Sequence, residues 1–343
     1  MKALLFGGSG IISSATAREL VAQNHEVWTV TRGNHTDDLP GGVHKLTADI
    51  HDETAMQALL AGQTFDVAID FIAFKPEDIQ RDFRILHDKI GQFVFISSAS
   101  AYDKPLADYR VSESMPLGNP YWEYARNKTA CEETLRALHR EHGFAYTVVR
   151  PSHTYNETFV PLALGGRIGF WQPLKRMLEY KPTLLHGDGA TLWTVTHARD
   201  VARGIVGLLG NIRAYGQAFN VVGDEVLTWT QVYECIAAAL GVTLNPFFAS
   251  SLFLAQSSDY DIRSCMLGER ACNAVYDNSR LKQLVPAFRQ EIRFEQGIRT
   301  TIEHVLATPA LQEEDPEFDR WCDAVVRRSM EAAALVRSDM GLV

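Results

Sequence analysis

Short apolar runs alternate with longer amphipathic stretches over the first 150 residues. The runs are almost continuously apolar, which is typical of strands that helices cover on both faces. They predict strands at 3–6, 26–31, 43–47, 66–72, 92–97 and 146–150. The stretches between them predict helices at 11–23, 53–60, 76–90 and 120–142. Strands and helices that alternate at this spacing indicate βαβ units and a parallel sheet.

The alternation stops after Pro151. Residues 152–195 carry glycine, proline and aromatic residues without a regular period, so we expect loops with short helices there. The later sequence predicts helices at 200–209, 228–240 and 315–336 and a strand at 218–222. Asp200 and Thr228 are the expected N-caps of the first two helices.

This change of rhythm predicts two domains. The first comprises residues 1–155, and 196–225 return to it. The second comprises residues 156–195 and 226–343. A chain of 343 residues is long enough for a large core of this kind.

Composition and charge exclude several classes of function. The net charge of −9 argues against a nucleic-acid surface, which needs a basic face. The five cysteines are scattered and form no CxxC, so neither a disulfide framework nor a metal site is expected. No apolar run is as long as a membrane span, and the apolar start of the chain is too short for a signal peptide. We therefore expect a cytoplasmic protein without nucleic-acid, membrane or metal partners.

A glycine turn follows the first predicted strand and opens the first predicted helix. It reads Gly7-Gly8-Ser9-Gly10-Ile11-Ile12-Ser13. Glycine lets the backbone turn tightly and approach a pyrophosphate, and the helix N-terminus offers N–H donors and partial positive charge. A strand before it and a helix after it make this turn a predicted dinucleotide site.

The end of the second strand bears on the choice between NAD and NADP. A carboxylate there would bind the ribose hydroxyls of NAD. The chain instead has Thr31 followed by Arg32, whose guanidinium suits a 2′-phosphate, so NADP is slightly preferred over NAD. Arg32 as a solvated loop residue is the alternative. After the third strand, Asp49 and Ile50 are candidates for the adenine edge, although Asp49 could equally cap a helix.

Three residues form the candidate catalytic group. Tyr124 and Lys128 are four residues apart, which places them on one face of the long predicted helix. Ser98 ends a predicted strand, so it would lie at the carboxyl edge of the sheet, where such folds bind ligands. A nearby ammonium favours the phenolate, which would let Tyr124 exchange a proton with a substrate oxygen. Lys128 could also hold the nicotinamide ribose, and Ser98 could donate a hydrogen bond to the substrate.

Motifs in a fixed order carry a resemblance. In order they are Gly7-x2-Gly10, Ser97-Ser98-Ala99-Ser100-Ala101-Tyr102, Tyr124-x3-Lys128, Arg150-Pro151 and Gly187-Asp188-Gly189. Over roughly residues 1–305 the chain resembles the extended short-chain dehydrogenases, and within them the NAD-dependent epimerase/dehydratase family.

The resemblance implies a fold, an assembly and further site residues. It implies an α/β Rossmann fold, a doubly wound parallel sheet with a smaller, mostly C-terminal substrate-binding domain. It implies a homodimer that pairs helices near 77–90 and 120–142. For the cofactor, besides the residues above, it implies Phe71, Ile72, Ala73, Ser97, Pro151 and His153. For the substrate it implies Ser98, Ser100, Tyr124, His153 and the position that Trp193 occupies.

The chain departs from the family pattern in four ways. Ser13 replaces the third glycine of the turn, and it is small enough to preserve the packing of helix on strand. Ala99 and Ser100 stand where family dehydratases carry an Asp-Glu pair, so dehydration is not expected. His153 replaces a substrate-binding asparagine, although it could simply be a packed or hydrogen-bonded histidine.

The fourth departure concerns the substrate. Trp193 replaces an arginine that pairs with the nucleotide diphosphate. It could stack on a sugar, or it could be a core aromatic. The loss of this cation argues against an ordinary nucleotide-diphospho-sugar.

The leading hypothesis is an NAD(P)-dependent sugar epimerase or ketoreductase. Its substrate would be a small-molecule sugar or sugar conjugate, with hydride transfer at a carbinol or carbonyl carbon and Tyr124 as acid and base. The alternative is a non-catalytic dinucleotide-binding sensor or RNA-associated protein on the same fold.

Overall fold

The computed structural model describes residues 1–33, 39–258 and 261–342 and resolves into two compact units. Unit 1 comprises residues 1–156, 194–225 and 275–292. Unit 2 comprises the described residues of 157–193, 226–274 and 293–343.

The segment 275–292 was expected in the second domain, but it belongs to unit 1. Its strand β15 (Val275–Tyr276) pairs with β6 (Arg110–Val111). Its side chains Leu281 and Phe288 are buried in a core cluster of unit 1. Because these contacts are between residues far apart in the sequence, the local pattern did not reveal them.

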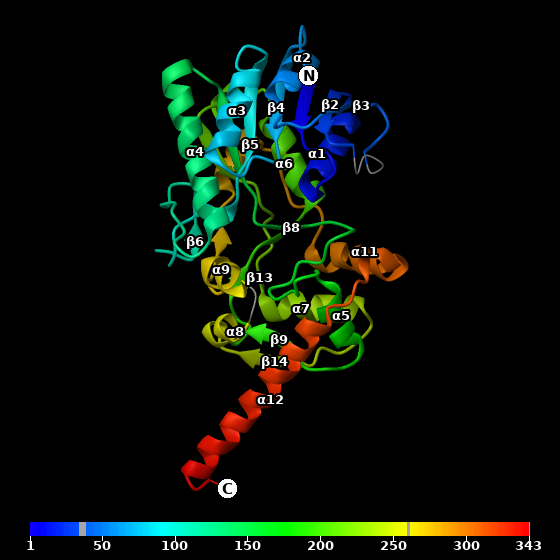
Figure 1. Cartoon of the computed structure of the whole chain (residues 1–343), viewed down its shortest axis with the longest axis vertical. Helices are drawn as coiled ribbons and strands as arrows, with labels where there is room; N and C mark the ends of the chain where they lie inside the picture. The colour runs from blue at the N-terminus through cyan, green and yellow to red at the C-terminus, as the bar shows by residue number, and fades with distance from the viewer. Residues whose placement is uncertain (34–38, 259–260, 343) are drawn as a thin grey trace. The chain divides into compact units, whose positions relative to one another are not determined.

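Unit 1 is built on a parallel sheet of seven strands (Figure 1). Across the sheet the order is β12-β7-β5-β4-β1-β2-β3. The strands are β1 (Lys2–Phe6), β2 (Glu26–Thr31), β3 (Val43–Thr47), β4 (Phe65–Asp70), β5 (Ile90–Ile96), β7 (Tyr146–Arg150) and β12 (Gln217–Asn220). The chain leaves β1 toward one edge and returns at β4 toward the other, which is the doubly wound Rossmann arrangement and confirms the predicted fold class.

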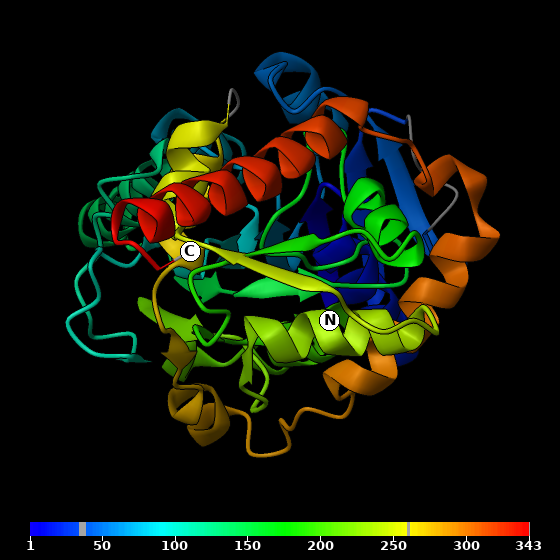
Figure 2. The ribbon, with the colours of Figure 1, turned by 90° about the horizontal axis from the view of Figure 1, so that it is seen from below.

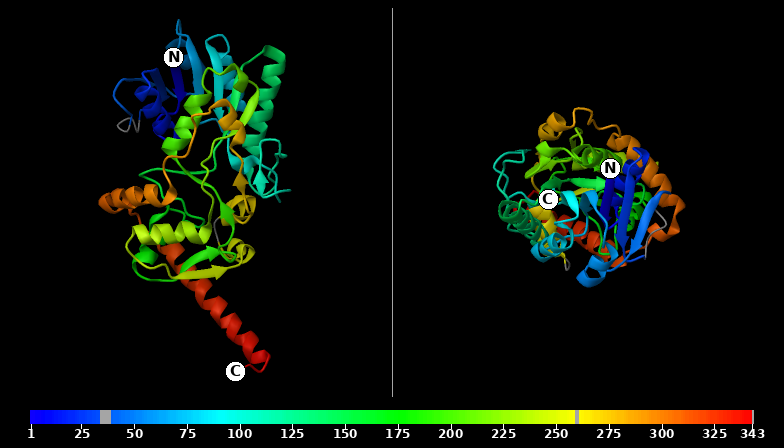
Figure 3. Two further views of the ribbon diagram at one scale, coloured as in Figure 1. Left: turned by 180° about the vertical axis from the view of Figure 1, so that it is seen from behind. Right: turned by 90° about the horizontal axis from the view of Figure 1, so that it is seen from above.

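Helices cover both faces of this sheet (Figures 1 and 3). On one face, α1 (Ile11–Ala22) and α6 (Ala198–Leu208) pack together over a buried cluster that contains Leu5. The other face carries α2 (Glu53–Leu59), α3 (Pro76–Leu86) and α4 (Glu123–His142). Burial on both faces explains why the central strands β1, β4, β5 and β7 are apolar at most positions. The edge strand β3 is largely exposed and carries His44, Lys45 and Thr47.

The structure differs from the sequence prediction at the end of β4 and at the start of α6, and it confirms the predicted cap of α7 (Trp229–Ala239). Strand β4 ends at Asp70 rather than residue 72, because Asp70 Oδ1 accepts the N–H groups of Ile72 and Ala73 and turns the chain. His197 rather than Asp200 caps α6. The Asp200 carboxylate instead accepts backbone N–H groups of residues 291 and 292. Thr228 caps its helix as predicted.

Shorter elements complete unit 1. They are η1 (Ala99–Ala101), β8 (His153–Tyr155), β11 (Val195–His197), η2 (Ile212–Ala214) and α10 (Ser279–Leu284). Strand β8 pairs in parallel with β11 directly after the sheet strand β7.

Within residues 157–193, where the sequence predicted loops with short helices, unit 2 also contains the strands β9 and β10. Its elements are α5 (Trp171–Leu178), β9 (Thr183–His186), β10 (Leu192–Trp193), β13 (Leu227–Thr228), α7 (Trp229–Ala239), β14 (Pro246–Ala249), α8 (Ser251–Ser257), α9 (Ile262–Cys265), η3 (Met266–Arg270), α11 (Phe294–Ala307), η4 (Pro309–Leu311) and α12 (Pro316–Asp339). Strands β9 and β14 pair in parallel, with α7 on one side and α12 on the other (Figure 2). None of the helices described is long and apolar enough to cross a membrane.

Candidate active site

The glycine turn lies at the point where the strand order of unit 1 reverses. Gly7 follows β1 and has φ +82°, a left-handed conformation that only glycine adopts without strain. A Cβ on Gly7 would lie 2.7 Å from Ile72 Cγ2, at the end of the neighbouring strand β4. Any other residue at position 7 would therefore have a strained backbone, and its side chain would clash with Ile72. Doubly wound sheets bind dinucleotides in this crevice.

The first turn of α1 has the properties of an anion site. Gly10 is the N-cap, and the helix has no acidic residue in its first turn. Ser13, the substitute for the third glycine, is buried, and its Oγ accepts the N–H of Gly10 at 2.9 Å. The partial positive charge of the helix end is thus uncompensated. These features fit the pyrophosphate of a dinucleotide.

The ends of β2 and β3 hold the residues predicted to select the cofactor. Thr31 Oγ1 accepts the N–H of Gly33 at 3.2 Å, and Arg32 is exposed beside it. Asp49 is exposed and accepts the N–H of residue 51 at 3.0 Å. Asp52, not Asp49, caps α2, so the capping alternative for Asp49 was wrong. Ile50 is buried, which leaves little of it to contact an adenine.

Tyr124 and Lys128 lie in the first two turns of α4. Lys128 is buried, and its Nζ donates to the carbonyl oxygens of Ala73 and Ile96, both at 2.8 Å. The same Nζ is 5.8 Å from the centroid of the Tyr124 ring. Burial lowers the pKa of Lys128 to about 8, against the opposing effect of nearby negative charge. The ammonium is therefore close to its point of deprotonation under mildly alkaline conditions.

Ser98 lies directly after β5, with its hydroxyl oriented by a neighbour. Its Oγ accepts two hydrogen bonds from Ser100, one from the backbone N–H at 3.1 Å and one from the hydroxyl at 2.8 Å. A serine hydroxyl has two acceptor lone pairs and one donor. The remaining capacity of Ser98 is its own O–H, which suits donation to a substrate oxygen.

Three predicted site residues are placed elsewhere by the structure. The Ser97 side chain is buried and donates to Glu132 Oε1 at 2.7 Å, so its hydroxyl hydrogen is already used within unit 1. Ser100 is fully buried and can affect a substrate only through Ser98. Trp193 exposes no surface and stacks on Trp229, with ring centroids 5.8 Å apart. It therefore offers no face to a sugar, as the core-aromatic alternative expected.

The remaining predicted residues lie on the loops that follow the sheet strands. Phe71 and His153 are half-buried, Ile72 is exposed, and Ala73 and Pro151 are buried. Phe71, Ile72 and Ala73 directly follow β4, and Pro151 and His153 follow β7. Topology thus brings them to the same carboxyl edge as Gly7 and Ser98.

Sequence reasoning missed a buried carboxylate pair beneath Lys128. Asp70 and Asp82 are both fully buried, and Arg81 donates to Asp82 Oδ1 through Nε and Nη2 at 3.0 and 2.8 Å. Burial and the adjacent Asp70 carboxylate raise the pKa of Asp82 well above its usual value. Asp70 also holds the amide of Ala73, whose carbonyl accepts from Lys128. A polar residue at the end of an otherwise apolar strand was the available signal.

We expect Asp70→Asn to move the alkaline limb of activity to lower pH. Among the charges that counteract burial on Lys128, Asp70 ranks first, ahead of Cys131, Asp78 and Glu132. Asparagine keeps an oxygen for the two amides but removes the charge, so the pKa of Lys128 should fall. At pH 8 activity should drop about two- to tenfold, with the acid limb unchanged.

The measurement is kcat/KM against pH, together with an NMR titration of labelled lysine side chains. Asp66→Asn is the matched control, because Asp66 lies on the same strand but is exposed and accepts the N–H of Lys2. Equal pH profiles for the two variants would contradict the role of Asp70.

A second missed group links α4 to β7. Glu132 is buried and accepts from Arg150 Nε at 2.9 Å and Nη2 at 2.5 Å. Arg150 also donates to the Tyr102 hydroxyl at 3.1 Å, and the ion pair with Glu132 raises its pKa despite burial. Glu132 follows Lys128 by four residues, so the spacing that joined Tyr124 to Lys128 could have identified it.

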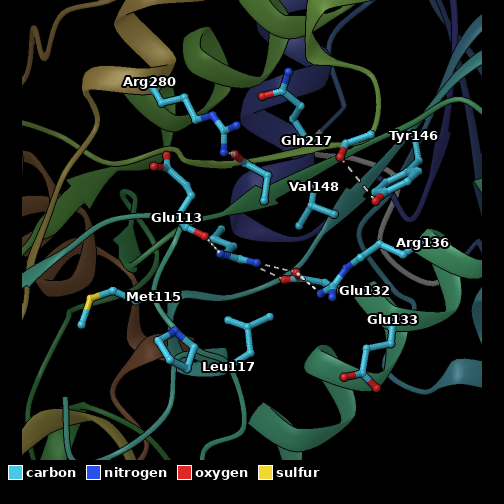
Figure 4. A pocket seen from close by; sticks show the side chains of 14 residues that line it. Glu113, Met115, Leu117, Glu132, Glu133, Arg136, Tyr146, Val148, Gln217 and Arg280 are labelled. Atoms are coloured by element: carbon cyan, nitrogen blue, oxygen red, sulfur yellow. Dashed lines mark hydrogen bonds and ion pairs between the residues drawn. The ribbon is translucent and has the colours of Figure 1, made fainter. Parts of the chain in front are cut away.

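A polar pocket of about 400 Å³ is lined by Glu132 and Arg150 of this ion pair (Figure 4). Its wall carries Arg136 and Arg280 together with Glu113 and Glu133. Figure 4 shows Arg136 directed at Glu132, which it approaches to 3.7 Å. None of the predicted cofactor or catalytic residues lines this pocket. It is thus separate from the candidate active site.

Within the described part of the chain, no three His, Cys, Asp or Glu side chains are arranged to hold a metal ion. The candidate catalytic side chains are Ser98, Tyr124 and Lys128.

Comparison with known proteins gives a consistent result. The model of the NAD-dependent epimerase/dehydratase family matches residues 3–222. A 2'-dehydrokanamycin reductase of Streptomyces kanamyceticus is 28% identical over 303 residues, which cover 84% of this chain and 80% of that protein. The chloroplast stem-loop binding protein of 41 kDa b from Arabidopsis thaliana is 24% identical over 253 residues, 70% of this chain and 63% of that protein.

A solved structure extends the likeness in fold. A dTDP-glucose 4,6-dehydratase of Streptomyces venezuelae, with NAD bound, superposes with a TM-score of 0.69 at 21% identity. The match covers 91% of this chain and 99% of that one.

Proposed function

Because the chain belongs to the NAD-dependent epimerase/dehydratase family, we propose that it reduces a ketone on a sugar that carries no nucleotide diphosphate. The observation that favours reduction over epimerisation is the similarity to 2'-dehydrokanamycin reductase, which extends over most of both chains. The chemical class of the substrate would be a keto-sugar within an aminated glycoside.

Two departures from the family pattern support that choice. Ala99 and Ser100 are buried and lack the carboxyl groups that family dehydratases use as acid and base. Buried Trp193 occupies the place of the diphosphate-binding arginine, so that cation is missing. The absence of this cation does not weaken the binding of an uncharged or cationic substrate.

The net charge points in the same direction. A chain with net charge −9 attracts cations to its surface and repels polyanions. A substrate with ammonium groups would therefore approach faster than a nucleotide-diphospho-sugar.

In this proposal the glycine turn, the start of α1 and Lys128 bind the dinucleotide. Gly7, Gly10 and the start of α1 hold the pyrophosphate of the dinucleotide, which supplies the hydride when bound. A lysine ammonium has three N–H donors, and Lys128 uses two on Ala73 and Ile96, so a third is available for a ribose hydroxyl.

The remaining two side chains act on the ketone. Ser98 donates its O–H to the ketone oxygen and polarises the carbonyl. Tyr124 then gives its phenolic proton to that oxygen as the carbon accepts hydride. The Lys128 ammonium stabilises the phenolate that is left.

The proposal is tested by turnover. The purified protein is given 2'-dehydrokanamycin with NADPH or NADH, and cofactor oxidation is followed by absorbance. UDP-glucose and UDP-galactose with NAD form the parallel assay for epimerisation. We expect stoichiometric oxidation of the reduced cofactor on the ketone and no interconversion of the UDP-sugars. Interconversion with a retained cofactor would overturn the proposal in favour of an epimerase.

The preference for NADP gives a separate prediction for Arg32. Arg32→Asp should weaken NADPH binding about ten- to hundredfold, because it replaces a cation at the 2′-phosphate with a like charge. Binding of NADH should change little or improve. Arg213→Asp is the control, because Arg213 is exposed and lies before β12, at the opposite edge of the sheet. Isothermal titration measures both affinities, and equal effects on NADPH and NADH would refute a 2′-phosphate contact.

The second candidate is an RNA-associated role. The likeness to the chloroplast stem-loop binding protein favours it, and the net charge opposes it. A filter-binding assay with a stem-loop RNA separates the two. Tight, salt-sensitive RNA binding without ketone turnover would favour this candidate.

A homodimer that pairs α3 and α4 remains a prediction from the family resemblance. Chemical cross-linking between those helices is its direct test.

A further inference from the structure

Aromatic rings as well as carbonyl oxygens surround the ammonium of Lys128. Its Nζ lies over the ring of Phe74, 4.6 Å from the centroid, and over the ring of Phe95, 4.7 Å from the centroid. The ring of Tyr124 is the third, at 5.8 Å. All three distances fall within the roughly 6 Å at which a ring face attracts a cation. With its two carbonyl acceptors, Lys128 thus occupies a site that favours a positive charge.

Phe74 differs from the other ring residues in its exposure. Phe95 belongs to β5 and is fully buried in a core cluster of unit 1. Phe74 lies in the loop between β4 and α3, and 47% of its surface is exposed. The same ring is 6.2 Å from the ring of Tyr124, centroid to centroid, at an interplanar angle of 48°. A half-exposed side chain therefore lies against two of the candidate catalytic residues.

The backbone of Phe74 is held in place independently of its ring. Its N–H donates to Asp78 Oδ2 at 2.9 Å. The preceding residue, Ala73, donates its own N–H to Asp70 Oδ1 at 2.7 Å and accepts from Lys128 through its carbonyl oxygen. The loop thus presents the ring to the ammonium from a fixed position. A substitution that changes only the ring should leave the loop where it is.

The charged groups around Lys128 are separate from this ring. Burial lowers the pKa of Lys128 to about 8, and nearby negative charge on three elements opposes that effect. The groups are Asp70 at the end of β4, Cys131 on α4, Asp78 on α3 and Glu132 on α4. The Phe74 ring carries no net charge, but the negative potential of its face favours an ammonium over a neutral amine. Its effect on Lys128 therefore has the same direction as that of the carboxylates.

We propose that Phe74 is a positioning residue: the face of its ring holds the Lys128 ammonium in its charged form beside Tyr124. An ammonium stabilises the phenolate that remains when Tyr124 has given up its proton, whereas a neutral amine does not. The inference rests on the proposed function for its effect on turnover. The contact between ring and ammonium belongs to the chain itself, so it can be measured without substrate.

The first experiment titrates Lys128 directly. Labelled lysine side chains of the full chain are followed by NMR, and the signal of Lys128 is identified by its loss in Lys128→Met. Phe74→Leu removes the ring face but keeps an apolar side chain, so it should lower the pKa of Lys128 by about 0.4 to 1 pH unit. Phe74→Trp offers the strongest ring face and should keep this pKa at or above its value in the wild type.

Fluorinated phenylalanines at position 74 separate the effect of the ring face from the exclusion of water. Fluorine withdraws electron density from the face and nearly preserves the shape of the ring, so water should reach Lys128 no more easily. We expect the pKa of Lys128 to fall stepwise as fluorines are added. A pKa that stays constant along this series would overturn the proposal. So would a higher pKa in Phe74→Leu, since water entry would then outweigh the ring.

Tyr109→Leu is the matched control. Tyr109 is another exposed aromatic residue of unit 1, with 57% of its surface accessible. Among the described residues, the rings over Lys128 Nζ are those of Phe74, Phe95 and Tyr124. Lys128 should therefore titrate in Tyr109→Leu as in the wild type. Equal shifts in Tyr109→Leu and Phe74→Leu would contradict a specific contact.

Turnover provides the second readout. A lower pKa of Lys128 means that the ammonium is lost at lower pH, so the alkaline limb of kcat/KM should move to lower pH in Phe74→Leu. At about pH 8 this variant should lose two- to fivefold in kcat/KM, with the acid limb unchanged, and Phe74→Trp should restore the wild-type profile.

The two readouts distinguish this inference from the proposed function. If the chain did not reduce the ketone, the titration would still decide whether the ring holds the ammonium. If the chain reduced the ketone and Phe74→Leu had the pH profile of the wild type, Phe74 would have no positioning role and the proposed function would stand.

Discussion

Replacing Tyr124 with phenylalanine is expected to lower kcat of the ketone reduction by about 10²- to 10⁴-fold, the usual contribution of a positioned acid. The change removes one oxygen and keeps the ring. The ring packs 5.1 Å from Trp122 and 6.2 Å from Phe74, centroid to centroid. Those contacts persist in the variant, so the fold and cofactor affinity should be unaffected. The loss should therefore appear in kcat, with little change in the melting temperature.

Tyr121→Phe is the control for this experiment. Tyr121 is three residues earlier and 40% exposed, and it makes the same chemical change outside the Tyr-x3-Lys pair. Its turnover should match the wild type. If Tyr124→Phe retained full turnover, the proton would have to come from another group, and the non-catalytic alternative would gain support.

Glu132→Leu is expected to destabilise the chain by about 3–5 kcal/mol, because it leaves the Arg150 guanidinium buried without its counter-ion. Arg150 and Glu132 are both almost completely buried, and Ser97 also loses its acceptor in this variant. For a unit of this size the melting temperature should fall by roughly 10 °C. Thermal and denaturant unfolding measure the change.

Glu133→Leu serves as the neighbouring control. Glu133 is exposed, so its replacement should stay within about 0.5 kcal/mol of the wild type. The double variant Glu132→Leu with Arg150→Met should recover much of the loss, because it removes both buried charges. A Glu132 variant no less stable than Glu133→Leu would show that the ion pair contributes little.

The predictions for Tyr124 and Glu132 concern residues on the same face of α4. Tyr124, Lys128 and Glu132 are spaced by four residues along α4. Tyr124 and Lys128 meet the loops at the carboxyl edge of the sheet. Glu132 links α4 to β7 through its ion pair with Arg150. It also links α4 to the end of β5 through the hydrogen bond from Ser97, the residue before Ser98. The ion pair thus fixes the position of two candidate catalytic residues relative to each other.

The sequence by itself determined the sheet strands of this protein, the glycine turn between β1 and α1, and the placement of Tyr124 and Lys128 on one helix. Each of these depends on local information: apolar runs, glycines between a strand and a helix, and a spacing that matches one helical turn. Topology then follows, because alternating strands and helices bring the strand ends to one edge. Local chemistry also correctly assigned Thr228 as a cap.

Only the tertiary structure decided which side chains face that edge. Ser97 and Ser98 are adjacent in sequence, yet one turns inward to Glu132 and the other takes two hydrogen bonds from Ser100. Trp193 has the chemistry of a sugar-stacking residue, but contact with Trp229 buries it. The carboxylates of Asp70 and Asp82 meet only when β4 and α3 pack. Partners of this kind are distant in sequence, so burial and hydrogen bonding, rather than residue type, settle their roles.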